Sequence, residues 1–283
     1  MKRLFYYLVV MSIISISISS CKKENSDPEA QNSTAVDESV VISGIISDSF
    51  TDLISLSAEN EALFSVSGSD FQIQDVPAST KTSCGEISLS PLNSTWPKTL
   101  TVDFGAGCTV DNVTRKGKIK AVFSDHFKNT GAKITVTFEN FQVNDHKIEG
   151  TKIITNNGKN AAGRFNFNVE VSDAKITSSG KVISFSSENN IEWIEGAGTR
   201  TASDDWFSIT GSANGTASNG QDVAITIVKP LIVKAGCRFI VAGSADIKAG
   251  SHPTSTLDYG QGECDNKATV TVSGETKEIT LHK

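Results

Sequence analysis

The chain has few of the residues on which familiar catalysis depends. It contains four histidines in 283 residues: His126, His146, His252 and His282. No two of them form an i, i+4 pair, and no H-E-x-x-H zinc motif occurs. The G-x-S-x-G pattern of a serine nucleophile elbow is also missing. We therefore expect a protein without a cofactor or catalytic metal, and a non-catalytic role is favoured over an enzymatic one.

Clustered positive charge is also scarce. The formal net charge is −6, and the densest basic stretch, RKGKIK at residues 115–120, is interrupted by Gly117 and Ile119. Nucleic-acid backbones are bound by clustered Lys and Arg, so we expect no nucleic-acid partner. Past the N-terminus, no apolar run is long enough to span a bilayer.

One apolar run does occur at the N-terminus. It extends from Leu4 to Ile18, follows Lys2 and Arg3, and ends in Ile18-Ser19-Ser20-Cys21. At roughly fifteen residues it is short for a membrane span but suits the apolar region of a secretory signal. An aliphatic residue, two small residues and a cysteine form the pattern of a lipobox. We therefore predict a signal peptide over residues 1–20 and acylation, such as palmitate on Cys21; the alternative is an ordinary signal peptide with an incidental cysteine.

The residues after Cys21 are polar and lack apolar periodicity as far as residue 39. Such a composition cannot bury enough surface to fold, so residues 21–39 are predicted to be a flexible tether. Apolar residues at helical spacing follow, from Ile42 to Ile54, and predict one amphipathic helix at about residues 40–57. Residues 40–283 are expected to form a single β-rich domain.

From about residue 83 the apolar pattern alternates with period two. Examples are Phe165, Phe167 and Val169, which are separated by asparagines, and turn pairs such as Asn219-Gly220 punctuate the pattern. Alternation of this kind predicts strands with one face in a core and one in water. We expect an all-β fold, an antiparallel meander of about twelve strands closed as a barrel or folded as a sandwich. The sequence does not separate these two architectures.

Four cysteines remain besides Cys21, and in an exported protein an even number suggests two disulfides with three possible pairings. The block TVDFGAGC, ending at Cys108, resembles TLDYGQGEC, ending at Cys264. In each case another cysteine lies 24 to 27 residues upstream. The simplest pairing is therefore Cys84 with Cys108 and Cys237 with Cys264. The alternative is four reduced, buried thiols.

Each of these blocks also carries an aspartate followed by glycines. The pairs Asp103 with Asp111 and Asp258 with Asp265 would supply oxygen ligands to calcium. The spacing does not match an EF-hand loop. We favour a tight turn in which glycine supplies a positive φ and the aspartate caps the turn, with no metal.

Two tryptophans are the best candidates for ligand binding. Trp193 and Trp206 flank the glycine-rich residues 195–199. An exposed indole can stack on a sugar ring, whereas a buried one only fills the core. The segment also supplies carboxylates for an enzymatic alternative, a glycan hydrolase: Glu192, Glu195, Asp204 and Asp205. Such an enzyme needs two carboxylates facing one cleft.

With the lipobox, the polar tether and the two cysteine blocks together, the chain resembles uncharacterised outer-membrane lipoproteins of Bacteroidota, many of which have β-rich bodies. The resemblance implies an outer-membrane address in the cell envelope, on either its periplasmic or its surface side, and no particular activity. We expect a lipid-anchored envelope protein that binds or scaffolds, with a glycan or an envelope protein as partner. Besides the hydrolase, a self-associating structural protein remains an alternative.

Overall fold

All described strands belong to one antiparallel sheet. The computed structural model describes residues 34–44, 79–82, 84–110, 113–199 and 201–281. Fifteen strands are joined in sequence order from β1 to β15, except that β4 lies beside β5 at the end of β3. The all-β prediction is confirmed, with fifteen strands where about twelve were expected; one of the additional strands arises because β3 and β4 are two short strands that both pair with β5.

The elements have the following bounds: β1 Ser79–Thr82, β2 Gly85–Ser90, β3 Lys98–Asp103, β4 Cys108–Val110, β5 Val113–Phe123, β6 Lys133–Val143, β7 His146–Lys159, β8 Phe165–Ser178, β9 Lys181–Glu195, the 3-10 turn Ala202–Asp204, β10 Trp206–Thr216, β11 Asp222–Lys234, β12 Ala242–Ala249, β13 Ser255–Gln261, β14 Lys267–Val272 and β15 Glu275–Thr280.

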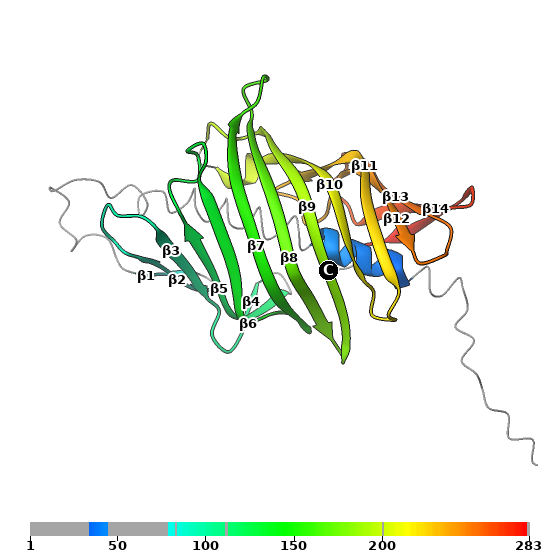
Figure 1. The fold of residues 1–283 in the computed structure, drawn as a ribbon, viewed down its shortest axis with the longest axis horizontal. Coiled ribbons are helices and arrows are strands. Elements are labelled where there is room, and N and C mark those ends of the chain that lie inside the picture. The colour runs from blue at the N-terminus through cyan, green and yellow to red at the C-terminus, as the bar shows by residue number, and fades with distance from the viewer. Residues whose placement is uncertain (1–33, 45–78, 83, 111–112, 200, 282–283) are drawn as a thin grey trace, which may run out of the picture.

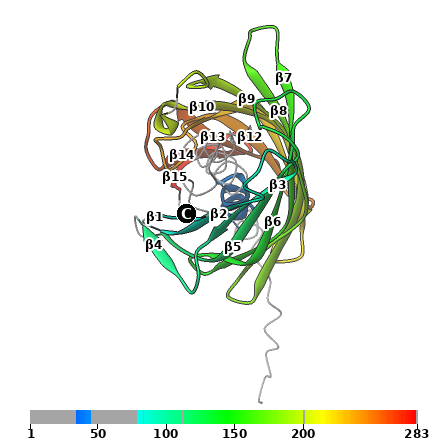
Figure 2. The same ribbon diagram turned by 90° about the vertical axis from the view of Figure 1, so that its left-hand side faces the viewer.

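The sheet curls without closing. Its order ends at β1 and β15, and within the described residues these two strands do not pair with each other. In Figure 1 the strands succeed one another along the longest axis, with β1 and β14 towards opposite ends. Figure 2 shows the same sheet curled around a central space. The fold is therefore a single curled layer, intermediate between the expected barrel and sandwich.

Alternation gives the sheet two different faces. Phe167 and Val169 of β8 are buried, whereas Asn166 and Asn168, which alternate with them, are partly exposed. The buried residues of neighbouring strands lie opposite each other in register, as Phe167 does to Ile191. The concave inner face is thus the hydrophobic core, and the convex outer face carries polar side chains, as the period-two pattern predicts.

Bulges help to curl the sheet. Between β5 and β6 the register shifts at Gly117, which has φ +75°, opposite Asn140, which has φ +50°. A Cβ atom at Gly117 would collide with the backbone carbonyl of Asn140. The site therefore requires glycine, and the extra residue on the partner strand bends and twists the ladder locally.

The N-terminal helix lies inside the curl (Figure 2) and is described over residues 34–44. Its predicted start at residue 40 was wrong by at least six residues, because the helix already occupies part of the predicted tether. Ala35, Val36, Ser39 and Ile42 are buried, and their spacing forms one helical face. Serine and alanine gave this face too weak a hydrophobic signal. The signal peptide, Cys21, the rest of the tether and residues 45–57 lie outside the described residues.

Candidate functional site

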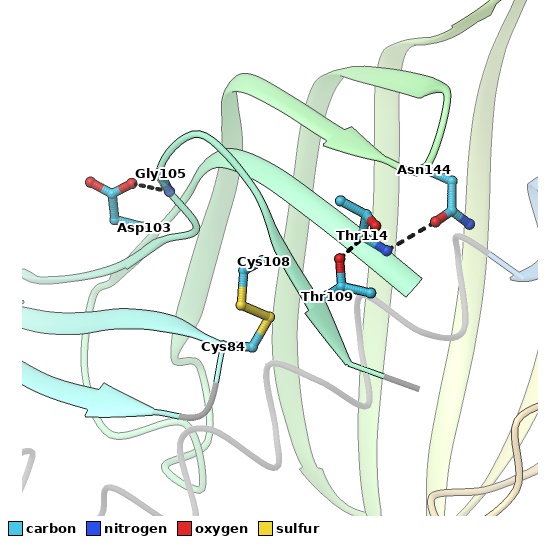
Figure 3. The surroundings of a disulfide bond; sticks show 7 residues. All are labelled: Cys84, Asp103, Gly105, Cys108, Thr109, Thr114 and Asn144. Carbon is cyan, nitrogen blue, oxygen red and sulfur yellow. Dashed lines mark hydrogen bonds between the residues drawn. A yellow bond between two sulfur atoms is a disulfide. The ribbon is translucent and has the colours of Figure 1, made fainter. Parts of the chain in front are cut away.

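Both predicted disulfides are present. Cys84 is bonded to Cys108 and Cys237 to Cys264, with Cα–Cα distances of 5.3 and 5.6 Å. Each bond joins the residues flanking a hairpin, β2–β3 in one case and β12–β13 in the other. Figure 3 shows the first, beside the short strand β4, where the Thr109 and Thr114 hydroxyls lie 2.8 Å apart. The sequence similarity of the two blocks thus reflects two equivalent stapled hairpins.

The aspartates of the two blocks serve as turn caps. Asp103 Oδ1 accepts a hydrogen bond from the Gly105 amide at 2.9 Å (Figure 3), and Asp258 Oδ1 accepts the equivalent bond from Gly260 at 2.9 Å. The second oxygen of Asp103 lies 2.8 Å from Lys118 Nζ. That hydrogen bond to Lys118 is the main reason that the pKa of Asp103 is lowered.

This geometry gives a calcium ion little to bind. Asp258 Oδ2 faces Lys229 Nζ at 3.4 Å, so the cationic partner recurs in the second turn. Asp265 Oδ1 instead accepts the Lys267 amide. Among the described residues no group of three or more His, Cys, Asp or Glu side chains is arranged to hold a metal ion. Asp111, the fourth predicted ligand, lies outside the described residues.

The structure places the two candidate tryptophans on opposite faces of the sheet. Trp193 is 2% exposed and lies on the inner face of β9. Its ring centroid lies 5.6 Å from that of Phe207, 6.2 Å from Phe165 and 6.3 Å from Phe127. Trp193 therefore packs within an aromatic cluster that fills the core near the start of β10.

A buried carboxylate closes this cluster. Asp205 is 3% exposed, and its Oδ1 accepts a hydrogen bond from Trp193 Nε1 at 3.0 Å. Burial raises the pKa of Asp205 to about 6, while the Trp193 hydrogen bond opposes the rise. Lys128 Nζ lies 5.4 Å from the centroid of the Trp193 ring and 3.3 Å from the Ala197 carbonyl, to which it donates. These contacts join the turn after β5 to the turn after β9.

Of the two candidate tryptophans, Trp206 is the one that solvent reaches. It precedes the inward-facing Phe207 by one residue, so its side chain lies on the outer face, where it is partly exposed. Lys234 Nζ lies 4.1 Å from the centroid of its ring and donates a hydrogen bond to the Gly262 carbonyl at 2.8 Å. The lysine thus holds one side of the indole in place through a cation–π contact.

A polar patch continues the outer face from Trp206 towards β7; it comprises Asn160, Arg164, Asn166, Asn190 and Glu192. Glu192 Oε1 accepts a hydrogen bond from Asn160 Nδ2 at 2.6 Å and lies 3.6 Å from an Arg164 nitrogen. Asn166 and Asn190 exchange side-chain amide hydrogen bonds of 2.7 and 2.8 Å.

Sequence reasoning named only Glu192 of this patch. The detectable signal was the pair of outward-facing asparagines, Asn166 and Asn168, at the start of β8, but the sequence did not show which residues of β9 lie beside them.

The carboxylates proposed for a hydrolase are divided by the sheet. Glu192 lies on the outer face within the polar patch, whereas Asp205 is buried against Trp193 on the inner side. Glu195 and Asp204 are exposed, and Asp204 accepts a hydrogen bond from Thr199. The pair Glu192 and Asp205 therefore does not face a common substrate position.

A scan against protein-family models found no match, and neither did searches of curated proteins and of solved structures. In the part of the chain that the structure describes, no helix has the length and apolar character needed to cross a membrane. The outer face around Trp206 is the candidate site because it combines a partly exposed indole with grouped amide, guanidinium and carboxylate side chains.

Proposed function

We propose that the protein is a lipid-anchored protein of the cell envelope that binds a glycan without catalysis, through the outer face around Trp206. The observation that carries this proposal is the partly exposed indole beside the polar patch. Sugar rings have an apolar C–H face that stacks on an indole and hydroxyls that hydrogen-bond to carboxylates and amides. Trp206 supplies the first kind of contact, and Glu192 and Asn166 supply the second.

The rigidity of the surface supports a binding role. Lys234 is fixed by the Gly262 carbonyl and in turn covers one side of Trp206. Glu192 is held by Asn160 from the β7–β8 turn. Side chains that are already ordered lose less conformational entropy when a ligand binds, so this arrangement favours affinity.

The predicted anchor suits this position of the site. Glu38 of the N-terminal helix accepts a hydrogen bond from the Ser218 amide, in the turn at one end of β10. Trp206 lies at the opposite end of this eleven-residue strand, on the order of 33 Å away at about 3.3 Å per residue. Cys21 precedes this helix in the sequence, and the helix contacts the end of β10 opposite to Trp206.

The test is glycan binding by the folded body, prepared with the Cys21→Ser change so that it is soluble. A glycan array identifies ligands, and titration calorimetry then compares the protein with a Trp206→Ala variant. Loss of the stacking contact is expected to weaken binding by about tenfold or more, since about 1.4 kcal/mol corresponds to a factor of ten.

Trp96→Ala provides the matched control. Trp96 is also partly exposed, but it packs against His126 and Lys98, outside the polar patch. This variant is expected to retain full affinity. If no glycan binds the body, or if Trp206→Ala binds the glycan as tightly as Trp96→Ala does, the proposed function is wrong.

A further inference from the structure

The amide side chains of the polar patch are part of a ladder across three strands. Asn166 of β8 and Asn190 of β9 exchange hydrogen bonds, and Asn157 of β7 donates to Asn166 Oδ1 at 3.2 Å. In register, Asn190 lies opposite Asn168, and Asn166 lies opposite Glu192. Three neighbouring strands thus present primary amides in one hydrogen-bonded row on the outer face.

The hydrogen-bonding positions that the ladder leaves unused indicate which ligand group it can bind. A primary amide has two N–H donors and an oxygen with two acceptor positions. Asn166 Oδ1 accepts from both Asn157 and Asn190, whereas the exchange with Asn166 uses one donor and one acceptor position of Asn190. Asn190 can therefore still donate to a carbonyl and accept from an N–H. The N–H and C=O of a trans acetamido group point in opposite directions, so the group engages Asn190 through one of them, its carbonyl oxygen accepting from the remaining Asn190 N–H.

The distance from the ladder to Trp206 indicates a chain rather than a single sugar. Trp206 lies two residues before Ser208, which pairs with Glu192, which in turn pairs with Asn166. Two residues along a strand and two strand spacings of about 4.8 Å separate Trp206 from Asn166 by roughly 12 Å between Cα atoms. Asn190, which pairs with Thr210, lies four residues and one strand spacing from Trp206, at roughly 14 Å. Glu192 lies between them, where its carboxylate can accept hydroxyl hydrogen bonds. An oligosaccharide is needed to reach both ends.

We propose that the ligand is a glycan chain carrying N-acetyl groups, with one ring stacked on Trp206 and an acetamido group bound at Asn190. This inference rests on the proposed function and specifies the ligand class of the same site. An amide carbonyl oxygen is a stronger hydrogen-bond acceptor than a hydroxyl oxygen, so the remaining Asn190 N–H favours the acetamido carbonyl. A chain with an acetamido group in place of the 2-hydroxyl is therefore bound more tightly than its hydroxyl counterpart.

The experiment compares two oligosaccharides of equal length by titration calorimetry, a chito-oligosaccharide and a cello-oligosaccharide, which differ in the acetamido group. The wild-type body is expected to bind the N-acetylated chain about fivefold more tightly, because a net hydrogen bond contributes about 1 kcal/mol. Glycan strands released from peptidoglycan form a third probe. Binding to them and not to the chito-oligosaccharide would place the recognised feature outside the acetamido group and overturn the proposal.

The variant Asn190→Asp removes both amide donors at nearly constant shape. It is expected to lose the preference for the N-acetylated chain while keeping the affinity for the cello-oligosaccharide. Asn214→Asp is the matched control, an exposed asparagine on the outer face of β10, near its other end. It is expected to keep the preference.

The outcomes separate the two proposals. Equal binding of the two wild-type oligosaccharides, or a preference retained by Asn190→Asp, overturns the inference and leaves glycan binding intact. Failure of the whole glycan array overturns the proposed function itself. Where thermal denaturation shows Asn190→Asp to be unfolded, Asn190→Ser takes its place in the same comparison, because it also removes the amide donors and is expected to lose the preference.

Discussion

At the scale of single residues, adjacent side chains of β10 lie on opposite faces of the sheet. Phe207 is buried in the aromatic cluster, while its neighbour Trp206 is partly exposed on the outer face. Asp205, one residue further back, is buried with its carboxylate against the Trp193 indole. Three consecutive side chains thus belong to a buried polar contact, the proposed binding surface and the core.

The stability of the protein should depend on the ionisation of Asp205. Its pKa in the folded protein, about 6, lies above the ordinary value of 3.8, so between these values the folded state binds more protons than the unfolded state. Stability therefore falls as the pH rises from about 4 to about 6, and it stays reduced above.

Asp205→Asn keeps an acceptor for the Trp193 indole and removes the buried charge. We expect it to raise the free energy of unfolding at pH 8 by on the order of 1–2 kcal/mol, with little effect at pH 4. Urea denaturation at both pH values measures this difference. Asp173→Asn, at an exposed position of β8, is the control and should show none; an equal effect of Asp205→Asn at both pH values would contradict the assignment.

At the scale of elements, the two stapled hairpins lie near the two edges of an open sheet. Edge strands lack one neighbour and separate more readily than central ones. The Cys84–Cys108 bond fastens β2–β3, next to the edge strand β1, and the Cys237–Cys264 bond fastens β12–β13, two strands from the edge strand β15. Each disulfide therefore restrains a hairpin that lies close to an open edge of the sheet.

Removing either disulfide is expected to lower the free energy of unfolding. The closed loops span 24 and 27 residues, and for loops of this length the chain-entropy contribution is about 3 kcal/mol. The double substitutions Cys84→Ser with Cys108→Ser, and Cys237→Ser with Cys264→Ser, test this by urea denaturation. Because the two hairpins are far apart in the strand order, their effects should add. A double-serine protein as stable as the parent would refute the structural role.

At the scale of the whole molecule, one curled sheet separates an apolar interior from a polar exterior. The interior encloses the N-terminal helix (Figure 2), and the exterior carries the proposed glycan site. Glu38 connects the helix to the β10–β11 turn, so the chain enters the body near one end of β10. The turn that the helix contacts and the proposed site therefore lie at opposite ends of β10.

The anchor itself is tested on the full chain. Cys21→Ser is expected to abolish incorporation of labelled palmitate and to move the protein from the membrane fraction to the soluble fraction. The variant Cys84→Ser, which removes a disulfide cysteine instead, should keep the label. Undiminished labelling of Cys21→Ser would disprove the acylation of Cys21.

The local pattern of the sequence determined much of the fold. Period-two alternation depends only on neighbouring residues, so it predicted the strands and the two faces of the sheet. The repeated cysteine block predicted both disulfides, because each pair flanks a single hairpin and the pairing is local as well. The helix was placed too late, since its buried face is built partly from Ala35 and Ser39, which have little hydrophobicity.

Only the tertiary structure decided the features that depend on contacts between distant strands. The alternating pattern does not show at which residues the turn between Trp193 and Trp206 begins and ends. The sequence therefore did not show that the two indoles lie on opposite faces. The amide ladder depends on the register of β7, β8 and β9, which several bulges shift. The curvature of the sheet is likewise the sum of small twists and bulges over fifteen strands. Alternation within single strands does not report this sum, so the sequence predicted a barrel or sandwich whereas the sheet is open.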